Sequence, residues 1–172
     1  MKAIHTTLRG LLLAATTALV LSVPRESAAG GSGPSILRLR IVHPITITKL
    51  ADLEFGRLSA GAAGGTAVIS ATGLRSVTGD VVEEGGTIGA AEFEVGGHQL
   101  LDYDIILPSS TVISNGGNSM TVDTFTTDKP GNVGDIPPGN TDSFKVGATL
   151  TVGASQAAGA YTGTFDVTVV YQ

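Results

Sequence analysis

From residue 35 onward, apolar and polar residues alternate with a period of two over most of the chain. The clearest case is the C-terminal segment 161–172, where the apolar residues share one face. These residues are Tyr161, Phe165, Val167, Val169 and Tyr171. The opposite face is polar except for Val170. This pattern predicts a long strand with one buried face and one solvated face, and it places Phe165, Val167 and Val169 in the core.

The same alternation recurs in several shorter segments, with weaker examples between them. Strong strands are predicted at 144–152, 101–107 and 91–95, and weaker ones at 66–71, 75–78 and 120–125. Clusters of Gly and Asn separate these segments, and both residue types accept the positive φ of tight turns. Short strands at this spacing predict one all-β domain, an antiparallel β-sandwich. The segment 127–141 contains three prolines and is predicted to be a surface loop.

The composition excludes several classes of function. The chain has no Cys, which excludes a disulfide scaffold, a thiol nucleophile and a Cys-ligated metal site. Its 15 acidic residues outnumber its 10 basic ones. This balance argues against nucleic acid as a partner, because such binding relies on basic side chains that neutralise phosphates.

The first 29 residues have the three parts of an export signal. Lys2 and Arg9 precede an apolar run at 10–23, and small residues end at Ala29. The run is shorter than the roughly 20 residues that a membrane-spanning helix needs. The pattern predicts a cleaved signal peptide at 1–29, with passage through the periplasm to the cell surface or the medium and no stable membrane span.

The sequence contains no convincing catalytic motif. Only His43 and His98 lie beyond the signal, and the segment 153–157 lacks the final Gly of a nucleophile elbow. We therefore expect neither an enzyme nor a cofactor.

Five oxygen-bearing side chains in and beside the 127–141 loop raise the question of calcium. They are Asp128, Asn132, Asp135, Asn140 and Asp142. Calcium prefers oxygen ligands, but this spacing does not match an EF-hand. A solvated acidic loop is the alternative, and the sequence leaves the choice open.

An extended segment precedes the predicted domain. Leu37, Leu39 and Ile41 share one face, while Arg38 and Arg40 lie on the other. Pro44 lacks an N–H and is expected to divide the stretch into strands at 36–42 and 45–50. Residues 36–42 are either an ordinary strand of a closed sandwich or a strand that pairs with a different molecule.

Residues 158–172 resemble the last strand of chaperone–usher fimbrial subunits, which commonly end in an alternating strand with a preceding Gly and a penultimate Tyr. Here that tyrosine is Tyr171. The wider chain is similar to a family of exported bacterial β-proteins of unknown function that is related to those subunits. The segments that carry this similarity are 51–56, 93–97 and 146–152. Fimbrial subunits typically have a disulfide, and this chain has no Cys.

The resemblance implies an immunoglobulin-like sandwich that lacks its last strand and receives one from the next subunit. On that basis the chain divides into a signal peptide at 1–29, an arm at 30–44 and a sandwich at 45–172. The donor residues would be Leu37, Leu39 and Ile41. The acceptor strand would comprise Tyr161, Phe165, Val167, Val169 and Tyr171. The implied partners are copies of the chain or related subunits, a periplasmic chaperone and an outer-membrane usher, in a fibre that serves adhesion.

The alternative is a monomeric secreted binding module for a carbohydrate or another surface ligand. Sugar sites usually need exposed aromatic side chains. The chain has only three Tyr and five Phe, and most of them lie on the predicted apolar faces.

Overall fold

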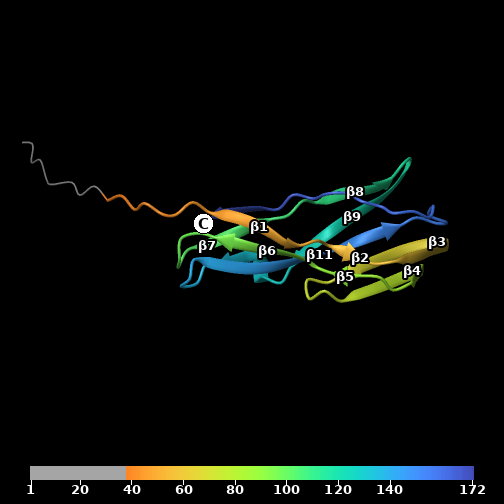
Figure 1. The fold of residues 1–172 in the computed structure, drawn as a ribbon, viewed down its shortest axis with the longest axis horizontal. Helices are drawn as coiled ribbons and strands as arrows, with labels where there is room; N and C mark the ends of the chain where they lie inside the picture. Colours follow the sequence, from red (N-terminus) through yellow and green to blue (C-terminus); the bar gives the residue numbers. More distant parts are fainter. Residues whose placement is uncertain (1–37) are drawn as a thin grey trace, which may run out of the picture. The chain divides into compact units, whose positions relative to one another are not determined.

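The computed structural model describes residues 38–172 (Figure 1). The chain divides into two units, Met1–Leu39 and Arg40–Gln172, and the second contains the fold described below. The predicted signal peptide and Leu37 lie outside the described residues. None of the helices in the described part is long and apolar enough to cross a membrane.

The folded unit is all-β, as the alternation predicts, and its strand pairs are antiparallel. The strands are β1 (Thr46–Ala51), β2 (Glu54–Phe55), β3 (Leu58–Ile69), β4 (Arg75–Glu83), β5 (Ile88–Gly89), β6 (Ala91–Gly96), β7 (Asp102–Ile106), β8 (Ser110–Asn115), β9 (Asn118–Thr127), β10 (Val133–Asp135), β11 (Thr141–Val152) and β12 (Thr168–Tyr171). A single 3₁₀ turn, Pro130–Asn132, precedes β10.

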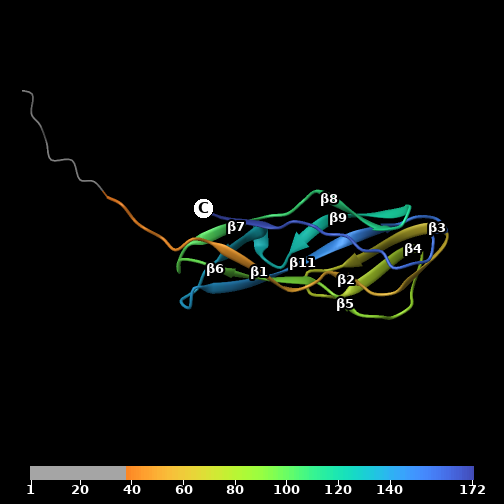
Figure 2. The same ribbon diagram turned by 45° about the horizontal axis from the view of Figure 1, so that its top comes forward.

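The strands form a large sheet, a three-stranded sheet and a two-stranded ribbon in a sandwich-like arrangement. The large sheet has the order β1-β6-β11-β3-β4, and the β8–β9 hairpin also joins it through β11. The small sheet has the order β10-β7-β12, and β2 pairs with β5. Figure 2 shows the same elements from a second direction.

Strand β11 organises the large sheet because it changes partner along its length. Thr141–Val146 pairs with β6, and Ala148–Val152 pairs with β3. Gly147 lies at the change, where a Cβ atom would clash with the main chain of Ile69 and Ser70. Because glycine has no Cβ atom, β6 and β3 can follow one another as partners along β11.

Two apolar clusters lie along β11. The first packs β6 and the first half of β11 against the three-stranded sheet, and in it Phe93 stacks on Phe144 with ring centroids 5.4 Å apart. Its buried members include Val95, Tyr103, Ile105, Ile136, Val146 and Val169. The second cluster consists of Ala67, Val81, Val122, Ala148, Leu150 and Val152, from β3, β4, β9 and β11. The three-stranded sheet contributes no residue to it.

The strong internal strands predicted from the pattern are confirmed. Residues 144–152, 101–107 and 91–95 correspond to β11, β7 and β6, and their predicted inward residues include Phe144, at 1% exposure, and Tyr103, at 0%. The two weak strands at 66–71 and 75–78 belong to β3 and β4, and 120–125 belongs to β9.

The prediction of one long C-terminal strand is wrong in its length. Only Thr168–Tyr171 forms a ladder, with β7, and residues 161–167 make a single bridge, Ser114 to Thr162. The reason is the length of β7, which ends at Ile106, two residues before Pro108. The alternation of burial persists, with Val169 buried and Phe165 and Val167 only half-buried.

Two further expectations need correction. The predicted loop at 127–141 contains β10, which pairs with β7, and the fully buried Ile136. Residues 38–42, part of the strand predicted at 36–42, form no ladder within the described chain, whereas the next predicted strand corresponds to β1. Residues 133–135 form a strand because β7 is available as a partner, and residues 38–42 form none because no described strand pairs with them. Local alternation of residues does not indicate whether a partner strand is available.

Candidate functional site

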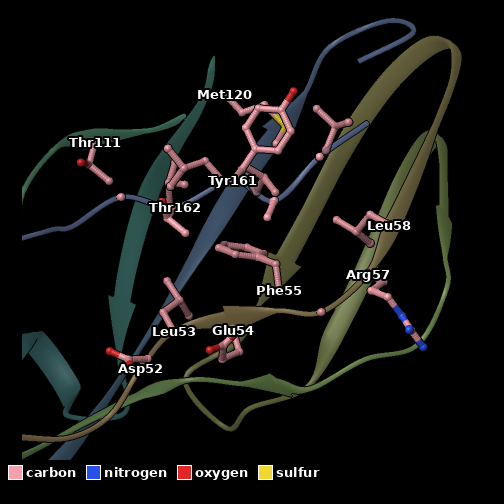
Figure 3. Close-up of a pocket in the computed structure, with 18 of the residues that line it drawn as sticks. Asp52, Leu53, Glu54, Phe55, Arg57, Leu58, Thr111, Met120, Tyr161 and Thr162 are labelled. Atoms are coloured by element: carbon pink, nitrogen blue, oxygen red, sulfur yellow. The ribbon is translucent and has the colours of Figure 1, made fainter. Parts of the chain in front are cut away.

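An open groove with a volume of about 1140 Å³ lies over the second apolar cluster (Figure 3). The side chains that line its interior come from β2, β3, β9, β11 and the C-terminal segment. They include Phe55, Leu58, Val122, Leu150, Val152 and Tyr161. In Figure 3, Phe55 extends from β2 into the space below Tyr161, and the hydroxyl end of Tyr161 points away from Phe55. The groove therefore exposes apolar surface that the three-stranded sheet does not cover.

The two rims of the groove differ in charge. The first rim consists of residues 49–60 together with Glu84, and it carries every charged residue that lines the groove. These residues are Lys49, Asp52, Glu54, Arg57 and Glu84. The second rim, residues 156–165, is uncharged and includes the small-residue run 157–160. Small side chains allow another backbone to approach this second rim closely.

The second rim makes few main-chain hydrogen bonds with the rest of the described chain. Within residues 156–167, Thr162 forms both backbone bonds, from its N to Ser114 O at 3.1 Å and from Ser114 N to its O at 2.9 Å. The hydroxyl of Thr111 also donates to Thr164 O at 2.7 Å. The other main-chain groups of 156–167 have no backbone hydrogen-bond partner within residues 38–172. The edge strand of a sheet likewise presents unpaired N–H and C=O groups.

Side-chain bonds hold the aromatic residues of this rim in place. Gln156 Nε2 donates to the Tyr161 hydroxyl at 2.8 Å, and that hydroxyl donates to Ala157 O at 2.7 Å. The ring of Phe165 contacts Phe125, with centroids 5.0 Å apart, and meets Phe93 edge-on at 6.3 Å. Tyr161 is thereby oriented over the groove, while Phe165 joins the groove to the first apolar cluster.

The structure separates the predicted acceptor residues into two groups. Tyr161 and Phe165 line the groove. Val167 and Val169 pack on the first apolar cluster. Tyr171 packs there as well, and its hydroxyl donates to His43 O at 2.9 Å and accepts from His98 N at 2.6 Å. Only the earlier part of the predicted acceptor strand therefore borders open apolar space.

The two donor residues that the structure describes are strongly exposed. Leu39 is 87% exposed and Ile41 is 84% exposed. Between them, Arg40 Nη2 lies 2.9 Å from His98 Nε2, and the His98 ring meets His43 edge-on at 5.5 Å. The two histidines thus lie together near the start of β1. Ser155 lies elsewhere, in the turn after β11, where its main-chain N–H donates a hydrogen bond to Gly61 O.

Three of the five oxygen-bearing side chains considered for calcium, those of Asp128, Asn132 and Asp142, accept hydrogen bonds from other groups. Asp142 accepts from Lys129 Nζ at 2.8 Å and from the Tyr103 hydroxyl at 2.8 Å, and Asp128 accepts from Lys145 N at 2.8 Å. Burial and the Asp142 carboxylate together raise the pKa of Tyr103. Within residues 38–172, no three His or acidic side chains are grouped so that they could hold a metal ion.

The first rim of the groove was not predicted from the sequence pattern. Leu53 and Phe55 alternate with Asp52 and Glu54, which is a period-two signal, but it covers too few residues to stand out. Met120 and Ile113 also line the groove, from the β8–β9 hairpin.

The chain matches a known protein family. No curated protein and no solved structure matches the chain significantly. A family model described as a domain of unknown function, DUF4402, matches residues 45–171, which include every strand of the folded unit. The chain therefore belongs to the DUF4402 family.

Proposed function

We propose that the protein is a structural subunit of a bacterial surface fibre, in which the arm of one copy fills the groove of the next. The observation that carries this proposal is that one chain has both an exposed apolar arm and an open apolar groove. Leu39 and Ile41 expose more than four-fifths of their surface, and the same chain has an apolar groove that its own sheets leave open. The arm therefore has apolar side chains that no described part of its own chain covers, and the groove has apolar surface that no described strand of its own chain covers.

The energetics favour such a pairing. Burial of Leu37, Leu39 and Ile41 would contribute about 5–9 kcal/mol at most. Main-chain pairing along the second rim would add about 0.5–1.5 kcal/mol per net hydrogen bond. Together these contributions could offset the free energy of association and of ordering the arm.

The mode of binding would be the addition of a strand to an exposed edge. In such complexes the main chain supplies hydrogen bonds and alternate side chains fill pockets. The second rim offers main-chain groups without backbone partners, and the arm offers apolar residues at every second position. The groove interior offers the apolar contacts.

The wider context of the proposal comes from the sequence. The predicted signal peptide supports export through the periplasm to the surface. The fimbria-like C-terminus supports a chaperone and an usher as further partners and adhesion as the role of the fibre.

The test uses the full mature chain and two matched substitutions. Leu39→Asp places a charge in the arm, and Leu100→Asp places one at another leucine that is 74% exposed and lies outside the groove lining. We expect the unsubstituted chain and Leu100→Asp to form concentration-dependent oligomers in analytical ultracentrifugation, and Leu39→Asp to remain monomeric. The Leu39→Asp variant retains its groove, so adding it to the unsubstituted chain should shorten the oligomers. A monomeric unsubstituted chain, or equal assembly by all three proteins, would refute the proposal.

A second candidate function is a monomeric binding module for a small ligand. The volume of the groove, about 1140 Å³, is slightly above the range of ordinary ligand pockets. Tyr161 and Gln156 would supply an aromatic face and a polar group. In that case the groove would bind ligand while both leucine variants stayed monomeric.

A further inference from the structure

We infer that the groove selects the arm of a second copy by charge as well as by apolar contact, with Glu54 and Glu84 of the first rim receiving Arg38 and Arg40. This inference rests on the proposed function. It adds a polar recognition element on the outer surface, where the arm's arginines would lie.

The first observation is the distribution of charge between the two parts of the chain. Residues 45–172 contain five basic and fourteen acidic residues, which gives a net charge of −9. The arm, residues 30–44, contains Arg38 and Arg40 and no acidic residue. Opposite net charges on donor and acceptor accelerate their encounter and disfavour wrong partners.

The second observation is that the charged groups of the groove belong to one rim. On that rim Asp52 is paired with Lys49, so its charge is largely compensated. Glu54 has no ion-pair or hydrogen-bond partner among residues 38–172, and Glu84 accepts only from the Ser59 hydroxyl, at 3.0 Å. The nearby Glu83 is already paired with Arg75 at 3.3 Å. Glu54 and Glu84 are therefore the carboxylates of this rim that have no cationic partner.

The third observation concerns the faces on which these groups lie. Glu54 is exposed, and its neighbour Phe55 projects into the groove from the other side of β2 (Figure 3). In an arm that places Leu39 and Ile41 on the groove floor, Arg38 and Arg40 face outward, because successive side chains of a strand alternate. The long arginine side chains then share the outer surface with Glu54 and can reach the rim.

Arg57 lies on the same rim and has the same charge as the arginines of the arm. Its side chain projects away from the apolar interior in Figure 3, so it stays outside the path of the arm. Exposed ion pairs each contribute little, and two of them change a dissociation constant by about two- to tenfold. Charge is therefore expected to tune the selection of the arm, and the apolar residues to supply most of the affinity.

The experiment measures the binding of a labelled peptide of residues 35–43 by fluorescence anisotropy. The acceptor is the full mature chain with Leu39→Asp, which keeps the groove and cannot donate its own arm. Rim variants add Glu54→Gln and Glu84→Gln. The control adds Glu94→Gln, which removes one negative charge, as each single rim substitution does, from an exposed position of β6 that does not line the groove.

At about 0.05 M salt, we expect the double rim variant to bind the peptide two- to tenfold more weakly and the Glu94→Gln control to bind it unchanged. At about 0.5 M salt the difference should largely disappear, because screening shortens the range of exposed charges. A peptide with Arg38→Gln and Arg40→Gln should bind the original rim as weakly as the original peptide binds the neutralised rim.

The two proposals fail in different ways. If the peptide binds equally to the rim variants and the control at both salt concentrations, the charge selection is wrong and the fibre proposal stands. If the original peptide does not bind at all, both proposals are overturned. If the rim variants bind more tightly, the rim repels the arm and the inference is again wrong.

Discussion

The hydroxyl of Tyr171 donates a hydrogen bond to the carbonyl oxygen of His43, at 2.9 Å, across a sequence separation of 128 positions. The same hydroxyl accepts a bond from the main-chain N–H of His98 at 2.6 Å. One side chain near the C-terminus thus holds two other segments, the residues before β1 and the turn after β6. The sequence pattern placed Tyr171 on the apolar face of the C-terminal segment, and the structure adds a polar role for its hydroxyl.

Tyr171→Phe should therefore destabilise the protein while leaving the ring in place. The substitution leaves His98 N–H and His43 O without their partner, and the unfolding free energy should fall by about 1–3 kcal/mol. Urea denaturation followed by fluorescence measures the change. Tyr161→Phe is the matched control, since its hydroxyl bonds only Gln156 and Ala157 on an open rim, and it should cost less than 1 kcal/mol.

Burial of the Tyr103 hydroxyl predicts a loss of stability at alkaline pH. Burial and Asp142 raise the pKa of Tyr103 in the folded state, so the folded protein keeps a proton that the unfolded chain releases. Above the usual tyrosine pKa of about 10, the unfolding free energy should fall by up to about 1.4 kcal/mol per pH unit from this group. Denaturation at a series of pH values should show a shallower slope for Tyr103→Phe, and an unchanged slope would contradict the assignment.

The partner change of β11 makes Gly147 sensitive to any side chain. Gly147→Ala would push a methyl group into the main chain of Ile69 and Ser70, and we expect a loss of about 1–3 kcal/mol or more. Gly117→Ala is the control, because open space surrounds that position and its φ is not positive. It should be neutral or slightly stabilising in thermal denaturation. Equal effects of the two substitutions would mean that β3 and β6 do not meet at Gly147.

The difference in burial between β11 and the C-terminal segment gives a graded prediction. Phe144→Ala should cost about 3–5 kcal/mol, because Phe144 is 1% exposed, and Phe165→Ala should cost less, because Phe165 is half-buried. Thr164→Ala and Thr168→Ala should each cost well under 1 kcal/mol. If Thr168→Ala costs as much as Phe165→Ala in the same denaturation assay, the inward face of the segment is misassigned.

The candidate site was predictable in part. Residue alternation in the arm identified Leu39 and Ile41, and both are exposed in the structure. Alternation also identified Tyr161 and Phe165, which line the groove. It could not separate them from Val169 and Tyr171, because apolar residues on one face look alike whether they border a closed core or an open groove.

Residue alternation carries local information about this protein. A period of two states which residues of a strand share a face, so it correctly assigned the inward residues of β6, β7 and β11, such as Phe93 and Phe144. The absence of a helical period likewise determined the all-β class. Which extended segments form a ladder depends on long-range contacts, because a ladder needs a partner strand that is distant in the chain. Residues 161–167 make only a bridge because β7 ends at Ile106, and Asp142 is engaged by Lys129 and Tyr103 because three segments converge there. The groove depends on the same kind of contact, since its rims come from residues 49–60 and 156–165, about a hundred positions apart.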